Sequence, residues 1–329
     1  MNTLVTGGTG FVGGAIVREL LARRHAVRVL ARRTSATAPL ETAGAAIARG
    51  DILDRDSLVR ALQGRDTLFH AAAIYDTWIP DQELLFQTEV QGTRNVLEAA
   101  LAAGVERVVY TSTALSIGER RGETGTEQTP HRGYFLTAYE ESKFRAEQLV
   151  RTYSGRLKVA ILNPAAVLGP GDRKPTGQAI IHVLNGKLPA LFDGVLTYVH
   201  VDDVARGHVL AAEQERWGER FILAARALTN RELFGIVCRL GGVRKPPTLP
   251  GFLVGLFADV QEWRSRRSGG RPLLARGSFD IARHGFRADG SRAARELGLV
   301  YTPIEESLRA AVQWYWEQGL LTRKPACSA

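Results

Sequence analysis

The stretch TGGTGFVG at residues 6–13 decides the fold. It follows a short apolar segment, NTLVTG at 2–7, and it opens a helical pattern of apolar residues over 12–24. Its glycines fit both G-x-G-x-x-G and the related G-x-x-G-x-x-G spacing, which lets backbone N–H groups approach a pyrophosphate at a helix N-terminus. The pattern therefore predicts a dinucleotide site whose phosphate-binding residues are Gly7, Thr9, Gly10, Phe11, Val12 and Gly13.

Short apolar runs alternate with helical patterns on the C-terminal side of this turn. Strands are expected at 26–32, 66–73, 106–113 and 156–164, and helices at 54–63, 82–103 and 137–153. This alternation predicts an α/β protein with a Rossmann-type, doubly wound parallel sheet. After Pro164 the pattern loosens, although TYVHV at 197–201 and FILAA at 221–225 still read as strands. We therefore expect a dinucleotide-binding domain from 1–165 plus 198–226, and a smaller discontinuous C-terminal substrate lobe from 166–197 plus 227–329.

The composition is that of an ordinary globular protein of 329 residues, with 45% hydrophobic and 23% charged residues. The net charge of +9 fits an anionic small ligand, a weakly anionic surface or a general use of arginine. No nucleic-acid recognition module accompanies it. Two distant cysteines, Cys238 and Cys327, form neither a disulfide framework nor a metal site, and they suit a reducing compartment.

The longest apolar run outside the glycine turn is LPGFLVGLFADV at 249–260. It is too short and too broken by glycine to span a membrane. No signal peptide is visible, so we expect a cytoplasmic protein without a membrane span.

The residues that end the predicted strands indicate which dinucleotide binds. Ala31, Arg32 and Arg33 end the second strand, where an acid would favour NAD and a cation would pair with the 2′-phosphate of NADP. Arg32 therefore favours NADP over NAD, unless both arginines are solvated loop charges. Further cofactor contacts are expected beside the adenine and where small residues let the backbone approach: Asp51, Ile52, Ala71, Ala72 and Ala73.

Tyr139 and Lys143 are spaced i, i+4 in a helical segment, which places them on one face. An ammonium beside a phenol lowers the tyrosine pKa, so Tyr139 could exchange a proton with a carbonyl or alcohol oxygen. Thr113, in the hydroxyl-rich TST at 111–113, would orient that oxygen, and Thr111 would touch the cofactor. His70 is expected to be a packing residue rather than an acid or base.

These motifs together resemble the extended short-chain dehydrogenases/reductases, the superfamily of NAD(P)-dependent epimerase/dehydratase proteins. The resemblance covers nearly the whole chain, through TGGTGFVG, GDILD at 50–54, HAAA at 70–73, VQGTRNVLEAA at 90–100, VVYTST at 108–113, YEESK at 139–143, NPAAVLGPGD at 163–172 and YVHVDDVARGHVLA at 198–211. The branch it resembles most is dihydroflavonol-reductase-like and hopanoid-associated epimerase-like.

The resemblance implies a catalytic triad of Thr113, Tyr139 and Lys143, with Lys143 also holding the nicotinamide ribose. It implies that Asn163, Pro164 and Ala165 pass beside the nicotinamide carboxamide. One departure is Glu89, which stands where the family often has an asparagine. Glu89 would replace that asparagine's hydrogen bonds, or the proton relay would differ.

The substrate side is predicted from aromatic residues near the triad. Tyr75, Trp78 and Phe135 are candidate lining residues, and their apolar character favours a hydrophobic carbonyl compound, unless they are ordinary core. The arginine-rich run WRSRRSGGR at 263–271 would bind a second phosphate or be a solvated helix end. His200, Asp202 and Asp203 look like metal ligands, but we expect no metal and an aspartate that caps the next helix.

Three functions remain open on the sequence alone. The favoured one is an NADP-dependent oxidoreductase that reduces the aldehyde or ketone carbonyl of a hydrophobic small molecule. The second is an NAD-dependent sugar or sugar-nucleotide epimerase/dehydratase. The third, an NADP-binding sensor without turnover, is disfavoured by the intact Tyr139 and Lys143. By analogy with the family, a homodimer could form through helices 82–103 and 137–153.

Overall fold

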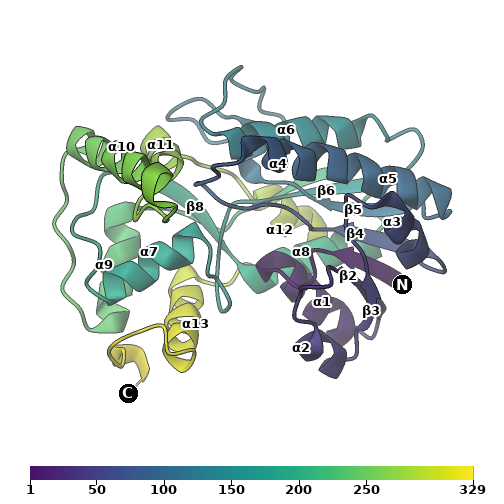
Figure 1. The fold of residues 1–329 in the computed structure, drawn as a ribbon, viewed down its shortest axis with the longest axis horizontal. Coiled ribbons are helices and arrows are strands. Elements are labelled where there is room, and N and C mark those ends of the chain that lie inside the picture. The colour runs from purple at the N-terminus through teal and green to yellow at the C-terminus, as the bar shows by residue number, and fades with distance from the viewer. Residues whose placement is uncertain (329) are drawn as a thin grey trace.

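The computed structural model describes residues 1–328 and contains a large and a small β-sheet. The large sheet has seven strands in the order β3-β2-β1-β4-β5-β6-β9, and every neighbouring pair is parallel (Figure 1). Its strands are β1 (Asn2–Thr6), β2 (Ala26–Ala31), β3 (Ala46–Arg49), β4 (Thr67–His70), β5 (Arg107–Thr111), β6 (Lys158–Pro164) and β9 (Arg220–Leu223). The predicted Rossmann-type sheet is confirmed.

Helices cover both faces of this sheet because its strands are apolar on both sides. Adjacent residues of β1 show the alternation, since Leu4 and Val5 are both fully buried but belong to separate apolar cores. The Val5 core includes residues of α1 (Phe11–Ala22), α8 (Val201–Glu213) and α12 (Ser291–Leu297). The Leu4 core includes residues of α3 (Arg55–Leu62), α5 (Gly92–Ala102) and α6 (Ala138–Arg151). A short α2 (Ala38–Thr42) lies between β2 and β3.

The small sheet has the order β10-β8-β7 and anchors a second lobe. Its strands are β7 (Ala166–Leu168), β8 (Val195–His200) and β10 (Arg226–Thr229). A third apolar core, which includes Tyr198 and Tyr315, joins this sheet to its helices. The lobe contains α7 (Pro175–Leu184), α9 (Asn230–Gly241), α10 (Gly251–Ser268), α11 (Arg276–His284), α13 (Ile304–Glu317) and a short 3₁₀ turn at Ala326–Ser328.

The chain passes between the two sheets several times after β6. Strands β7 and β8 pair in the small sheet, α8 packs on α1, β9 joins the large sheet, and β10 returns to the small one. Residues 198–200, which we assigned to the dinucleotide-binding domain, thus pair within the small sheet. Residues of α12, assigned to the substrate lobe, pack against α8 and β9. The division into two domains remains a prediction.

One predicted helix is interrupted. The sequence predicts a single helix over 82–103, whereas the structure has α4 (Gln82–Phe86), a π-helical turn (Gln87–Gln91) and then α5. A π turn inserts one residue beyond the α-helical repeat and is frequent at functional sites. No helix among residues 1–328 combines the length and apolar character that crossing a membrane requires.

Candidate active site

The glycines of the turn between β1 and α1 let neighbouring backbone segments approach each other closely. Gly7 has φ +73°, and a Cβ there would lie 2.6 Å from the backbone of Ala71 and Ala72. A Cβ on Gly13 would lie 2.2 Å from the carbonyl oxygen of Gly7. Gly10 precedes α1 without a side-chain cap, and the first turn of α1 carries no acid. The N–H groups of that turn are therefore free for an anion, and this cradle fits the pyrophosphate of a dinucleotide.

A cavity of about 650 Å³ extends from this turn along the carboxyl ends of the strands into the second lobe. That volume lies within the ordinary range for small-molecule sites. Nearly all the residues predicted to bind the cofactor line it: Gly7, Thr9, Gly10, Phe11, Val12, Gly13, Arg32, Asp51, Ile52, Ala71, Ala72, Ala73, Thr111, Lys143, Pro164 and Ala165. Asn163 does not.

Arg32 lies directly after β2 and is exposed. Within residues 1–328 its guanidinium has no hydrogen-bond or ion-pair partner, although its carbonyl oxygen accepts a hydrogen bond from Arg49 at 3.1 Å. Arg49 also donates to Ser35 and Thr37, so it fixes the loop that carries Arg32. The loop leaves one unpaired guanidinium at the adenosine end of the cavity.

Tyr139 and Lys143 both lie on the buried face of α6 and both line the cavity. Thr137 begins α6 as its N-cap, since its hydroxyl accepts the N–H of Glu140. The Lys143 ammonium donates to the Thr111 carbonyl at 2.9 Å and to the Tyr110 hydroxyl at 3.3 Å. The Thr113 hydroxyl accepts the N–H of Leu115, which leaves its own proton free to donate into the cavity.

Burial changes the proton affinities of this pair. The sequence predicts that Lys143 lowers the pKa of Tyr139, but burial outweighs that effect and raises the pKa of Tyr139 above its ordinary value. Burial by itself would lower the pKa of Lys143. The neighbouring Tyr110, Glu89 and Tyr139 outweigh it, so the pKa of Lys143 is raised and the ammonium persists. Tyr139 is thus a protonated phenol at neutral pH, ready to donate.

Glu89 is the unexpected neighbour of Lys143. It lies in the π turn, is 1% exposed, and places one carboxylate oxygen 3.3 Å from the Lys143 ammonium. Its other oxygen accepts the backbone N–H of Ile74 at 2.6 Å. The carboxylate therefore ties α6 to the loop after β4, and it does so with a charge that an asparagine would lack. The sequence identified the departure at this position but not the contact.

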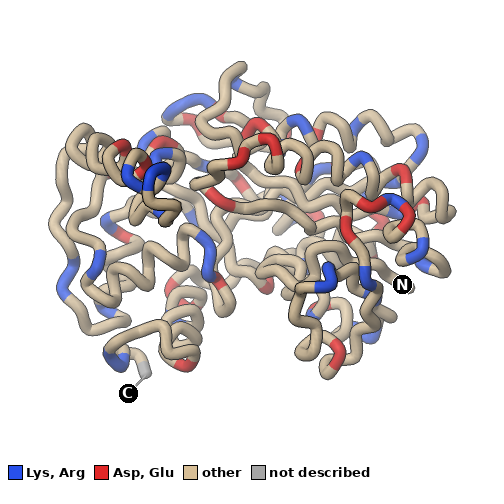
Figure 2. The backbone as a smooth tube through the Cα atoms, in the orientation of Figure 1, with Lys and Arg blue, Asp and Glu red and all other residues tan. Residues whose placement is uncertain are grey.

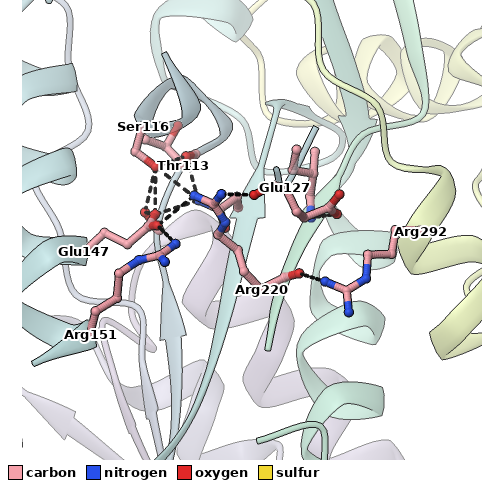
Figure 3. Close-up of polar contacts among 10 residues, drawn as sticks. Thr113, Ser116, Glu127, Glu147, Arg151, Arg220 and Arg292 are labelled. Carbon is pink, nitrogen blue, oxygen red and sulfur yellow. Dashed lines mark hydrogen bonds and ion pairs between the residues drawn. The ribbon is translucent and has the colours of Figure 1, made fainter. Parts of the chain in front are cut away.

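A second buried carboxylate, that of Glu147, accepts hydrogen bonds from residues next to Thr113. Glu147 continues the buried face of α6 two turns after Tyr139 and accepts hydrogen bonds from the hydroxyls of Ser112 and Ser116 at 2.6 and 2.7 Å (Figure 3). Burial alone would raise the pKa of Glu147, but the nearby Arg220 and these donors hold it below its usual value. The i, i+4, i+8 spacing from Tyr139 was the signal in the sequence that could have revealed Glu147.

Asn163 belongs to this supporting network and does not line the cavity. Its amide donates to the Thr113 carbonyl at 3.0 Å and to Glu147 at 2.8 Å, and the residue is fully buried. The side chain of Asn163 therefore turns toward α6, and its expected place beside the nicotinamide stays a prediction. Pro164 and Ala165 do reach the cavity. His70 is also structural, since Thr6 and Thr93 occupy its two ring nitrogens.

Two of the three predicted substrate residues line the cavity. Tyr75 packs on Tyr139 with ring centroids 5.2 Å apart, and Trp78 lines the same wall. Phe135 does not line the cavity, because its ring packs against His131 and Phe144. The distal wall is mainly apolar and includes Leu188, Leu191, Phe192, Leu233 and Phe234.

Asp172 is a further polar group beside the cavity. It is fully buried, and burial raises its pKa to about 7. One of its oxygens accepts the N–H of Lys174.

Residues 1–328 contain no cluster of three metal-ligating side chains. Contrary to our expectation of an aspartate cap, Asp203 does not cap α8. It accepts from the backbone and hydroxyl of Thr302 instead.

The fold and this site together define the class of protein. Residues 3–224 match the model of the NAD dependent epimerase/dehydratase family, and the chain belongs to that family. It is therefore an NAD(P)-dependent enzyme of the extended short-chain dehydrogenase/reductase type, as the sequence predicted.

Individual relatives cover almost the whole chain. A putative dihydroflavonol 4-reductase of Synechocystis sp. is 36% identical, over 96% of this chain and 94% of its own length. Sterol demethylase protein B of Methylococcus capsulatus is 35% identical, over 98% of this chain and 100% of its own. The crystal structure of gox2253 superposes with a TM-score of 0.86 at 38% identity, over 97% of this chain and 99% of that one.

Proposed function

We propose that this protein is an NADP(H)-dependent reductase that converts the aldehyde or ketone carbonyl of a mainly hydrophobic small molecule to an alcohol. The observation that supports the proposal most strongly is one continuous cavity, which Tyr139 lines. One end of it carries the glycine turn and the unpaired Arg32, and the other is walled by apolar side chains. The name of the Methylococcus relative, sterol demethylase protein B, fits an apolar substrate of this kind.

Four residues of this chain would take part in the reduction of the carbonyl. A bound nicotinamide would supply the hydride. The Tyr139 phenol donates its proton to the carbonyl oxygen, and the Thr113 hydroxyl donates a hydrogen bond to the same oxygen. The Lys143 ammonium stabilises the phenolate that remains. Glu89 holds that ammonium in place, so we assign Glu89 as a positioning residue.

Preference for NADP rests on Arg32. A guanidinium offers a planar fork of donors to a 2′-phosphate, and no acid follows β2 that would select a free 2′-hydroxyl. Because the Arg32 guanidinium has no partner within residues 1–328, it can turn to the phosphate without breaking a side-chain contact.

A paired titration of the purified protein with NADPH and NADH tests the proposal. Oxidation of the preferred nucleotide is then followed against carbonyl compounds of increasing apolar size. We expect tighter NADPH binding and turnover that improves with apolar size. NAD retained through purification, with no net oxidation on any carbonyl, would refute the reductase and favour the epimerase/dehydratase.

The proposal also concerns the compartment and the oligomeric state of the protein. The free thiols Cys238 and Cys327 fit a reducing compartment such as the cytoplasm. A homodimer through α4, α5 and α6 stays a prediction, which size-exclusion chromatography with light scattering would test.

A further inference from the structure

Helix α10 is apolar on two opposite sides. Its inner side, with Val254, Gly255 and Ala258, is buried, and Gly255 packs on Phe279 of α11. Its outer side exposes a stripe of large apolar residues, namely Phe252 (69% exposed), Leu256 (62%), Val260 (47%) and Trp263 (54%). The spacing of these residues puts them on one face. A surface helix ordinarily has only one apolar side, so the outer stripe requires a partner.

The unpaired charges around the stripe are positive. Of the two acids of α10, Glu262 is partly buried and accepts the Arg276 N–H, whereas Asp259 is exposed beside the stripe and pairs with Arg276. Arg264 and, in the last turn, Arg267 follow along the helix, and neither has an acidic partner within residues 1–328. Arg267 instead stacks over Trp263 at 4.0 Å. Figure 2 shows the basic segments gathered at the C-terminal end of α10.

The C-terminal end of α10 lies near the cavity. Residues 271–275, which follow α10 directly, line it. Trp78 lines it too, and the Arg266 guanidinium lies 5.2 Å from the Trp78 ring centroid. The C-terminal end of α10 therefore lies next to the loops that bound the substrate end of the site.

We propose that the outer side of α10 docks the protein on an anionic lipid surface. An apolar stripe with a tryptophan and flanking arginines is the pattern of a helix that lies in the plane of the interface. The arginines add attraction to anionic headgroups. A second copy of the chain fits this face less well, since the exposed acid beside the stripe, Asp259, is already paired with Arg276 and is not free to meet the arginines of its partner. In conjunction with the proposed reductase activity, docking brings the cavity to substrates dissolved in the bilayer.

The test is sedimentation with vesicles of phosphatidylcholine alone and of phosphatidylcholine with phosphatidylglycerol, without substrate. It reads lipid binding directly, so it can fail or succeed independently of the reductase proposal. We expect binding to the anionic vesicles that weakens as salt is raised. The double variants Leu256→Gln/Trp263→Gln and Arg264→Gln/Arg267→Gln test the two components.

We expect the apolar double variant to lose binding by at least about ten-fold. The arginine double variant should lose about five-fold for each charge removed. Matched controls are Val300→Gln and Arg323→Gln, which are exposed and lie outside α10, and they should bind like the wild type. All variants should keep the wild-type melting temperature and NADPH affinity.

Three results would overturn the proposal. The wild type could fail to bind anionic vesicles at low salt. The α10 variants could bind as well as the controls. Light scattering could show a wild-type dimer that Leu256→Gln/Trp263→Gln converts to a monomer, in which case a second copy covers the stripe.

Discussion

Replacing Glu89 with glutamine should move the pH dependence of the reaction and leave the fold intact. The side chain keeps its shape, but glutamine has one oxygen, which accepts from the Lys143 ammonium or from the N–H of Ile74 and not from both. What disappears is the negative charge 3.3 Å from the Lys143 ammonium. The ion pair is buried on both sides, so water cannot substitute for the lost charge.

The size of the effect follows from that distance. At 3.3 Å, with an effective dielectric constant of about 20, Coulomb's law gives roughly 5 kcal/mol of attraction. A glutamine oxygen turned toward the ammonium would still accept its hydrogen bond, which returns about 2 kcal/mol, and the Ile74 N–H would then lose this acceptor. The net loss of about 3 kcal/mol corresponds to a fall of about 2 units in the pKa of Lys143. That pKa starts above its ordinary value, so the ammonium survives at pH 7.

Loss of the Glu89 charge shifts the pKa values of both catalytic groups in the same direction. Carbonyl reduction needs the Tyr139 proton and the Lys143 ammonium, and both are lost as pH rises. The Glu89 charge raises the pKa of Tyr139 as well as that of Lys143, so its removal lowers both. The alkaline limb of the kcat/KM profile should therefore move by about 1 to 2 units to lower pH, while kcat/KM at pH 7 falls less than ten-fold.

The assay is NADPH-dependent reduction of the best panel substrate across the alkaline range. Glu83→Gln, an exposed acid on α4, is the matched control and should follow the wild-type profile. If the Glu89→Gln and wild-type profiles coincide, the charge of Glu89 does not govern the site, and its role is only to tie the loop after β4.

Other predictions address the remaining parts of the site. Tyr139→Phe should lower kcat by about 10²- to 10⁴-fold, with NADPH affinity by fluorescence titration unchanged. Retained turnover would remove Tyr139 from the mechanism. Arg32→Ala should weaken NADPH about 10-fold and leave NADH unaffected, since one exposed charge-assisted contact is lost. Equal effects on both nucleotides would contradict the 2′-phosphate assignment. Glu147→Gln should lower the free energy of unfolding in urea by about 3 kcal/mol, because Arg220 loses its buried partner. The folded-state pKa of Glu147 is depressed, so its contribution is present above pH ~4.3 and lost as pH falls below it. A loss that persists unchanged at pH 3 would contradict this account.

The parallel sheet and the cofactor turn were predictable because local patterns determine them. Strand periodicity and the Gly7–Gly13 spacing follow from backbone geometry that no distant contact alters. The i, i+4 spacing likewise places Tyr139 and Lys143 on one face wherever α6 packs.

The errors arise where distant contacts decide the outcome. Asn163 does not line the cavity, because its amide donates to Glu147 on another element. Phe135 packs on His131 and Phe144 rather than on substrate. The net pKa shift of Tyr139 depends on burial, which sequence does not report. The run at 249–260 is mostly apolar in sequence, and only the packing of α10 on α11 reveals that one of its sides stays exposed.

The π turn at 87–91 has a consequence for comparing this chain with others. Its hydrogen bonds enclose one residue more than an α-helix does, so α4 and α5 are out of phase. Removing one residue from the turn would make a continuous α-helix and rotate everything before the deletion by about 100° relative to α5. In an alignment this would be a single gap inside an otherwise unbroken helix, where gaps are not usually placed. Such a gap would mark a protein in which no acid reaches the lysine from this helix.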